Sequence, residues 1–208
     1  MVVGLTMLRD GAGDAFISAG STGALISAAT LIVKRIRGIR RAALGIEFPT
    51  AELGVNTLLL DCGANAECTP EYLLQFAYMG AFYMQRQHGI REARVALLNI
   101  GEEETKGVPL QRETYALLKK AHAEGRLKFT GNLEARDMQS GKADVVVADG
   151  YSVNMVLKTA EGIAGYMIDN IKDIFLKNSR TKLAALLVKP GLRELKKRMD
   201  YKEIGGTP

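Results

Sequence analysis

The chain has 208 residues, enough for one domain with a sizeable core, and its 47% apolar and 25% charged residues are typical of an ordinary globular protein. No apolar run approaches the roughly 18 residues of a membrane span. Cys62 and Cys68 give no disulfide framework and the N-terminus carries no secretory signal, so we expect a cytoplasmic protein. Residues 177–202 carry a net charge of +7 and the remainder −2, which indicates an acidic partner.

Two helices and a strand are predicted before residue 40. The first helix covers residues 1–8 and leads to a strand over 15–18. A second helix, apolar and rich in alanine, is predicted over 24–33. The turn 18–23 would therefore connect a strand to the N-terminus of a helix.

Strands and helices alternate through the middle of the chain. Its strands are short apolar runs, over 57–61, 94–99, 127–130 and 144–149. One helix, over 69–89, starts with Thr69 as N-cap and Pro70 at its first position, and another covers 110–123. This β-α-β order predicts an α/β fold, with a parallel sheet and helices on both faces.

The last part of the chain is helical, amphipathic and basic. Apolar residues recur at helical spacing from Ile163 to Phe175. Two short helices follow, one capped at Asn178 and one that begins at Pro190, each apolar on one side and basic on the other. We therefore treat 1–208 as a single, partial domain and 163–202 as an amphipathic basic segment within it.

Each predicted strand ends in a polar turn that contains glycine. Because the carboxyl ends of parallel strands meet at one edge, we expect a polar crevice there. In the turn 18–23, backbone N–H groups and the hydroxyls of Ser21 and Thr22 suit a phosphate or another oxyanion. Taken alone, this turn is an ordinary strand-to-helix connection, and the convergence of five turns favours a binding site.

Three cations lie near these turns: Lys106, Lys158 and Arg136. Lysine can hold a phosphate as a point charge. Lys158 follows Asn154 by one helical turn, so both could face the crevice. Lys106 could equally pair with a neighbouring glutamate, and each lysine is as compatible with a structural role as with a site.

The sequence offers no clear protein nucleophile. His88 and His122 fall in the last turns of helices, where a positive side chain is favourable. Cys62 lies at a strand end, where a small buried cysteine is commoner than a reactive one. No metal-binding spacing is present, and the turn 18–23 matches neither the Walker A nor the GxGxxG pattern, so we expect no metal and no cofactor. In a reaction at this crevice, the nucleophile would be a substrate.

Read as motifs, the turns resemble the phosphate acyltransferase family of PlsX type. The matching motifs run in the family's order from about residue 14 to 206: SAGSTGAL at 18–25, LLDCGAN at 59–65, LNIGEE at 98–103 with Lys106-Gly107, GNLEARD at 131–137, DVVVADG at 144–150, LKTAEG at 157–162 and TKLAA at 181–185.

The resemblance implies a three-layer α/β/α sandwich related to phosphotransacetylases and to the isocitrate dehydrogenase group, in a homodimer. It implies transfer of a fatty acyl group from acyl carrier protein to inorganic phosphate, which gives acyl phosphate for phospholipid synthesis, with no cofactor and no nucleic acid partner. Lys106 and Asn154 match positions that act on phosphate and thioester. The crevice would be lined by Ser21, Thr22, Gly23, Asn65 and Lys158.

The resemblance also gives the basic segment a use. Positive charge would steer acidic acyl carrier protein, and an amphipathic helix would touch the inner face of the cell membrane. The residues expected to make these contacts are Leu183, Leu186, Leu187, Leu192, Lys189, Arg193, Lys196 and Lys197. The leucines could instead pack against a partner subunit.

Other functions stay open, and some positions depart from the family pattern. One alternative is a short-chain phosphotransacetylase that uses coenzyme A thioesters, and another is an inactive remnant that binds anions or lipid. Ser21 replaces a usual asparagine, Glu67 replaces an aspartate, and Val153 replaces a glycine, which would crowd a ligand. The family's first strand with its glycine-rich turn, and its last strand, have no counterpart here, so we expect a piece of a larger domain.

Overall fold

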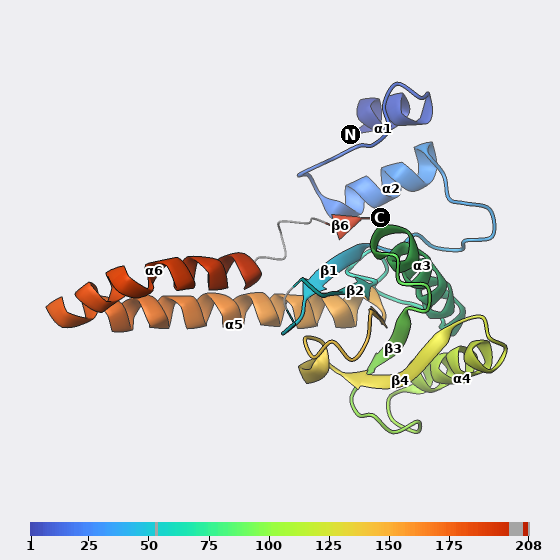
Figure 1. The fold of residues 1–208 in the computed structure, drawn as a ribbon. Coiled ribbons are helices and arrows are strands. Elements are labelled where there is room, and N and C mark those ends of the chain that lie inside the picture. Colours follow the sequence, from blue (N-terminus) through green and yellow to red (C-terminus); the bar gives the residue numbers. More distant parts are fainter. Residues whose placement is uncertain (53, 200–205, 208) are drawn as a thin grey trace.

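The computed structural model describes residues 1–52, 54–199 and 206–207. Its core is a six-stranded sheet in the order β4-β3-β5-β2-β1-β6 (Figure 1). The first four strands in this order are parallel, and β1 and β6 are antiparallel to the strands beside them. The strands are β1 (Gly45–Pro49), β2 (Asn56–Leu60), β3 (Arg94–Asn99), β4 (Lys128–Glu134), β5 (Val145–Val147) and β6 (Gly206–Thr207). The predicted α/β class with a mainly parallel sheet is confirmed.

Helices cover both faces of the sheet. On one face, α3 (Pro70–His88) and α4 (Pro109–Ala123) bury Phe76 and Leu118 in a core cluster that includes Val145 of β5. On the other face, the first turns of α5 (Gly150–Leu176) bury Val153 and Leu157 against β2 and β5. Alternate residues of β2, β3 and β5 face opposite layers, so the sheet is the middle of three layers. A short 3-10 helix, η1 (Ala135–Asp137), follows β4.

The boundaries of α3 follow the predicted signals. Pro70 is the first helical residue, and the helix ends at Gly89, whose φ of 71° lies in the left-handed region that glycine adopts readily. Thr69 stands at the N-cap position as predicted, but its hydroxyl makes no capping hydrogen bond.

The predicted strand over 15–18 is wrong. These residues form irregular chain between α1 (Val2–Arg9) and α2 (Thr22–Ile32), and Ile17 is 94% exposed. Phe16 lies against α1 instead, where a Cβ on Gly4 would be 2.3 Å from the Phe16 ring. A strand is stabilised by pairing, and this apolar segment packs on a helix instead.

Sequence reasoning also missed two strands at one side of the sheet. In β1, Glu47 and Pro49 break the apolar pattern, and the two-residue strand β6, which pairs with Gly45 and Ile46, is too short to give a pattern. Residues 205 and 208, on either side of β6, lie outside the described residues.

Two long helices form a hairpin that projects from the body (Figure 1). The predicted amphipathic helix is the second half of α5, which continues unbroken from Gly150. The two short helices predicted after it form a single helix, α6 (Ser179–Met199), with Pro190 inside it. An internal proline removes one backbone hydrogen bond, and α6 packs along α5, which offsets that loss. Residues 200–202 of the predicted basic segment lie outside the described residues.

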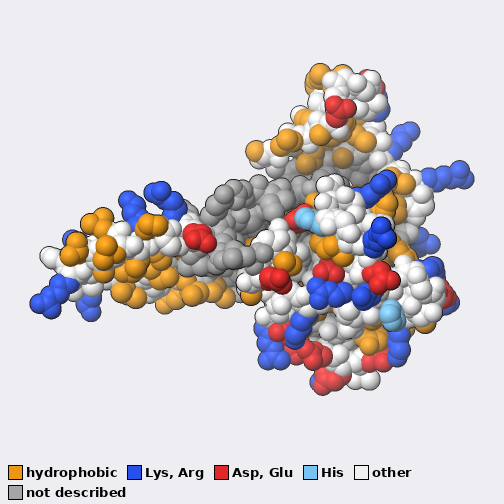
Figure 2. Space-filling view, viewed as in Figure 1, with side chains coloured by type: hydrophobic (Ala, Val, Ile, Leu, Met, Phe, Trp, Pro, Cys, Tyr) orange, Lys and Arg blue, Asp and Glu red, His pale blue; other side chains and the backbone are white. Residues whose placement is uncertain are grey.

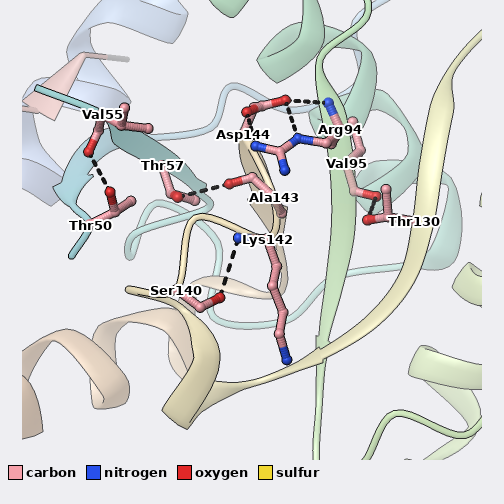
Figure 3. A network of polar contacts seen from close by, with 10 residues as sticks. All are labelled: Thr50, Val55, Thr57, Arg94, Val95, Thr130, Ser140, Lys142, Ala143 and Asp144. Atoms are coloured by element: carbon pink, nitrogen blue, oxygen red, sulfur yellow. Dashed lines mark hydrogen bonds and ion pairs between the residues drawn. The ribbon is translucent and has the colours of Figure 1, made fainter. Parts of the chain in front are cut away.

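Polar contacts join the strands at their amino ends (Figure 3). The Arg94 guanidinium donates to both Asp144 carboxylate oxygens, at 3.1 and 2.7 Å, and the Thr57 hydroxyl donates to the Ala143 carbonyl at 2.8 Å. Burial raises the pKa of Asp144, but the hydrogen bonds from Arg94 outweigh it and leave the pKa lowered. These contacts hold β2, β3 and β5 in register at their amino ends. The polar turns predicted to follow these strands lie at the opposite edge of the sheet, where the strands end.

Candidate functional site

The turn after β2 is organised by the buried carboxylate of Asp61. One oxygen accepts hydrogen bonds from the backbone N–H groups of Leu44 and Ala64, at 2.8 and 3.1 Å. The other oxygen accepts from the backbone N–H of Asn65 at 2.6 Å. Asp61 is fully buried, so these donors satisfy a charge that would otherwise be costly to bury. The carboxylate thereby holds together the turn and the chain that enters β1.

Asn65, expected to line the crevice, has its amide hydrogens engaged within the protein. Its Nδ2 donates to the Ala42 carbonyl at 2.7 Å and to Asp61 Oδ2 at 2.9 Å. Asn65 therefore braces the turn in this structure.

The turn from β5 into α5 packs directly on the turn after β2. The Gly150 N–H donates to the Asn65 carbonyl at 2.8 Å, and a Cβ on Gly150 would lie 3.0 Å from Gly63 Cα. Asp149 caps α5 by accepting from the backbone N–H of Ser152 at 2.8 Å. Asn154 lies beside Gly63, where a Cβ on that glycine would be 3.8 Å from Asn154 Cγ. Two of the predicted turns thus meet, with Asn154 exposed where they do.

Lys106 lies on the loop after β3, the strand next to β5. Two asparagines hold this loop: Asn99 Nδ2 donates to the Lys106 carbonyl at 3.1 Å, and Asn132 Nδ2 donates to the Glu103 carbonyl at 2.8 Å. The Lys106 side chain is half exposed, with Nζ 3.8 Å from Glu103 Oε1. Such a long, exposed ion pair contributes little, so the ammonium group is available to an anion.

The other two candidate cations pair with carboxylates on the surface. Lys158 Nζ lies 2.8 Å from Glu161 Oε2, and Arg136 Nε lies 2.9 Å from Glu134 Oε2. Lys158 is therefore directed along its own helix toward Glu161 in this structure.

The first predicted turn does not lie at the end of a strand. Ser21 is the N-cap of α2, where its Oγ accepts from the Ala24 N–H at 3.5 Å, and Thr22 and Gly23 form the first turn of that helix. All three are exposed, and α2 lies outside the sheet (Figure 1). The structure thus brings the turns after β2, β3, β4 and β5 to one edge but not this one.

Neither cysteine has the environment of a nucleophile. Burial raises the pKa of the Cys62 thiol strongly and that of the Cys68 thiol to about 12. The negative charge of Asp61 is the second cause for both thiols. His88 Nε2 contacts Glu47 at 2.9 Å and His122 Nδ1 contacts the Leu127 carbonyl at 3.1 Å, which agrees with structural roles.

The supporting roles of Asp61, Asn99 and Asn132 were missed by sequence reasoning. All three lie inside the family-like motifs. Asp61 directly follows β2 and Asn99 ends β3, so a polar residue at the end of a buried strand is a signal that could have found these two, whereas Asn132 lies within β4. Val153 has a different role from the one expected. Its side chain is fully buried in the core beneath α5, so it does not crowd a ligand at the edge.

The expected contact residues of the basic segment lie on the projecting hairpin. Figure 2 shows hydrophobic and basic side chains along it. Leu183, Leu186 and Leu187 are exposed, Leu192 is half-buried, and Lys189 and Arg193 are exposed. The side chains of Lys196 and Lys197 lie outside the described part of the chain. Within the described residues, no helix is both long and apolar enough to cross a bilayer.

Two solved phosphotransacetylases share this fold. The chain superposes on a phosphotransacetylase from Streptococcus pyogenes with a TM-score of 0.60 and 18% identity, over 78% of this chain and 54% of that one. EutD phosphotransacetylase from Staphylococcus aureus gives a TM-score of 0.56 and 20% identity, over 79% and 55% of the two chains. The predicted relation to the phosphotransacetylase fold is confirmed.

The sequence defines the family more narrowly than the fold does. Residues 1–208 match the family described as fatty acid synthesis protein, and the chain belongs to it. Its relatives include proteins named phosphate acyltransferase, from Alkaliphilus oremlandii with 47% identity over 100% of this chain, and from Heliobacterium modesticaldum with 49% identity over 100%. The predicted resemblance to phosphate acyltransferases is confirmed. The chain spans about 60% of the length of these relatives.

Proposed function

We propose that this chain is part of an enzyme that transfers a fatty acyl group from acyl carrier protein to inorganic phosphate. The observation that carries the proposal is the meeting of family motifs at one edge of the sheet. Asn154 lies beside Gly63 there, and the Lys106 loop follows the neighbouring strand β3. The product is an acyl phosphate, an activated donor for phospholipid synthesis.

The reaction needs no nucleophile from the protein. A phosphate oxygen attacks the thioester carbonyl carbon, a C–O bond forms and the C–S bond breaks, and the phosphate proton passes to the departing thiolate. The protein then has to bind the anion, orient it and stabilise the oxyanion of the tetrahedral intermediate. Lys106, half exposed and weakly paired, would hold phosphate, and the Asn154 amide would donate to the oxyanion.

The remaining candidate residues have supporting roles in this proposal. Asn65 shapes the turn through its contacts with Asp61 and Ala42. Lys158 would have to exchange its pairing with Glu161 for an anion in order to line the crevice. Ser21, Thr22 and Gly23 would act as an exposed helix N-terminus, which the structure leaves apart from the other turns.

The assembly and membrane contact expected from the resemblance are part of the same proposal. The exposed leucines of α6, with basic residues between them, suit either the surface of an anionic bilayer or a partner subunit in a homodimer. Acyl carrier protein, being acidic, would be attracted by the same basic segment.

The experiment that tests the function compares donors and variants in one assay. Acyl phosphate release is measured with acyl-acyl carrier protein and with acyl-coenzyme A, for the wild type, Lys106→Ala, Asn154→Ala and Lys128→Ala. Each of the first two variants should lose on the order of 10²–10³-fold in turnover, as loss of an oxyanion or anion contact does elsewhere. Lys128, which begins β4 at the opposite edge, is the matched control and should keep wild-type turnover.

Three outcomes would change the conclusion. Normal turnover of Lys106→Ala and Asn154→Ala would remove their assigned roles. A strong preference for coenzyme A thioesters would favour a short-chain phosphotransacetylase. Phosphate binding without product, in a chain extended to the full length of its relatives, would favour an inactive anion-binding remnant.

A further inference from the structure

A second concentration of positive charge lies in the loop between α2 and β1. Residues 34–41 hold five cations, and no acidic residue occurs between Asp14 and Glu47. The net charge outside residues 177–202 is −2 because acidic residues elsewhere outnumber the positive charges of this loop. Its cations are Lys34, Arg35, Arg37, Arg40 and Arg41.

These cations are exposed, and among the described residues none of them forms an ion pair with a carboxylate. Figure 2 shows Lys and Arg side chains that extend from the body on the side where this loop runs in Figure 1. Ile36 stands among them with 81% of its surface exposed. Unpaired charge on an exposed loop produces a local positive potential that attracts acidic surfaces.

The loop is held against α3 by specific contacts. The Gln75 side chain accepts from the Arg40 backbone N–H at 2.9 Å and donates to the Gly38 carbonyl at 3.0 Å. The Arg41 guanidinium lies 5.8 Å from the centre of the Tyr72 ring, within the range of a cation–π contact. A surface that is already ordered loses less entropy when a partner binds.

The loop leads directly into the candidate site. Arg41 is followed by Ala42, whose carbonyl accepts from Asn65, and by Leu44, whose N–H donates to Asp61. The positive loop therefore borders the edge of the sheet that carries Asn154. The tip of the α5–α6 hairpin, by contrast, projects away from the sheet (Figure 1).

We propose that the loop 34–41 is the docking surface for the acidic protein that carries the acyl thioester to this edge. The inference rests on the proposed function, because it says where the acyl donor of that reaction, acyl carrier protein, binds. An acidic protein fits better than a membrane: the loop is dominated by guanidinium groups, with Ile36 as its one strongly exposed large apolar side chain, whereas α6 presents several exposed leucines.

The test uses labelled acyl carrier protein as the acidic probe and measures its dissociation constant by fluorescence anisotropy at low and high salt. Arg37→Glu/Arg40→Glu should weaken binding on the order of tenfold or more at low salt, and the difference should shrink at high salt. The matched control is Arg91→Glu/Lys120→Glu, which changes net charge equally at exposed sites of the opposite edge. Gln75→Ala, which changes no charge, should also weaken binding because it frees the loop.

The outcomes separate this proposal from the proposed function. Supporting results are a selective loss of acyl carrier protein binding, with turnover of acyl-coenzyme A and binding to anionic vesicles unchanged. Equal losses in both charge-reversal variants, or a loss of vesicle binding alone, would overturn the docking surface. If the loop variant loses the probe but the wild type makes no acyl phosphate from either donor, the docking surface stands and the proposed function fails.

Discussion

The Glu47 carboxylate accepts a hydrogen bond from His88 Nε2 at 2.9 Å, which joins β1 to the last turn of α3. Asn56 and Tyr83 donate to the same carboxylate, at 3.0 and 2.9 Å. Burial raises the pKa of Glu47, but these hydrogen bonds together outweigh burial and leave the pKa below its ordinary value of 4.5. Glu47 is thus a charged group that the fold stabilises, although it lies almost fully inside the protein.

Acid should therefore weaken the fold through Glu47. A carboxylate whose pKa is lower in the folded state contributes its full stability above the unfolded value of 4.5, and that stability is lost as the pH falls through the folded value. We expect Glu47→Gln to lower the free energy of unfolding by about 2 kcal/mol at pH 7, since hydrogen bonds to a charged group contribute that much. Urea unfolding of the wild type and the variant between pH 3 and 7 measures both the loss of stability in acid and the effect of the substitution at pH 7. An unchanged pH slope below 4.5 in the variant would show that other carboxylates cause the acid sensitivity.

Gly80 marks the closest approach of α3 to the sheet. A Cβ at this position would lie 2.5 Å from Val145 Cγ1 and 2.9 Å from Leu60 Cδ1. We expect Gly80→Ala to lower the free energy of unfolding by about 1–3 kcal/mol, because an extra methyl overpacks this contact. Gly162→Ala in α5 is the matched control: no atom lies within 4 Å of its Cβ, so it should stabilise by up to about 1 kcal/mol. Equal effects in thermal unfolding would mean that α3 can shift away from the sheet.

Strong periodic patterns in the sequence predicted most of the sheet and its covering helices. The runs that became β2, β3 and β5 are apolar and buried, and α3 carries its proline and glycine signals at both ends. The segment 15–18 has an equally apolar pattern but became irregular chain, because the pattern does not say whether a partner strand is near. β1 was missed for the converse reason: Glu47 looks exposed in sequence, and only the donors from α3 and β2 make its burial possible.

The candidate site was predictable in its location more than in its details. That turns after parallel strands meet at one edge follows from topology alone, and the positions of Gly63, Gly150 and Asn154 agree with it. The direction of a side chain does not follow from topology. Asn65 and Lys158 both belong to matching motifs, yet one is bonded to Asp61 and the other to Glu161.

Both cysteines should react slowly with alkylating reagents in the folded protein. A pKa of about 12 for Cys68, against an ordinary 9.0, reduces its thiolate fraction at pH 7.5 by about a thousandfold, and Cys62 is more deeply buried. Iodoacetamide labelling followed by mass spectrometry should show slow modification of the native chain and rapid modification in urea. Cys62→Ala should retain activity in the full enzyme. Rapid labelling of native Cys62 with parallel loss of turnover would instead make that thiol part of the reaction.

The exposed leucines of α6 allow its two proposed partners to be told apart. Leu186→Glu/Leu187→Glu removes two side chains whose burial in an interface contributes about 1.5–3 kcal/mol each. If these leucines enter a bilayer, the variant should lose on the order of a hundredfold in binding to anionic vesicles by flotation, while its mass by light scattering stays unchanged. The control is Leu31→Glu/Val33→Glu, which places the same charges on exposed apolar positions near the end of α2. A variant that binds vesicles normally but halves its mass would assign the leucines to a partner subunit, because a subunit interface, unlike a bilayer, changes the size of the particle when it is broken.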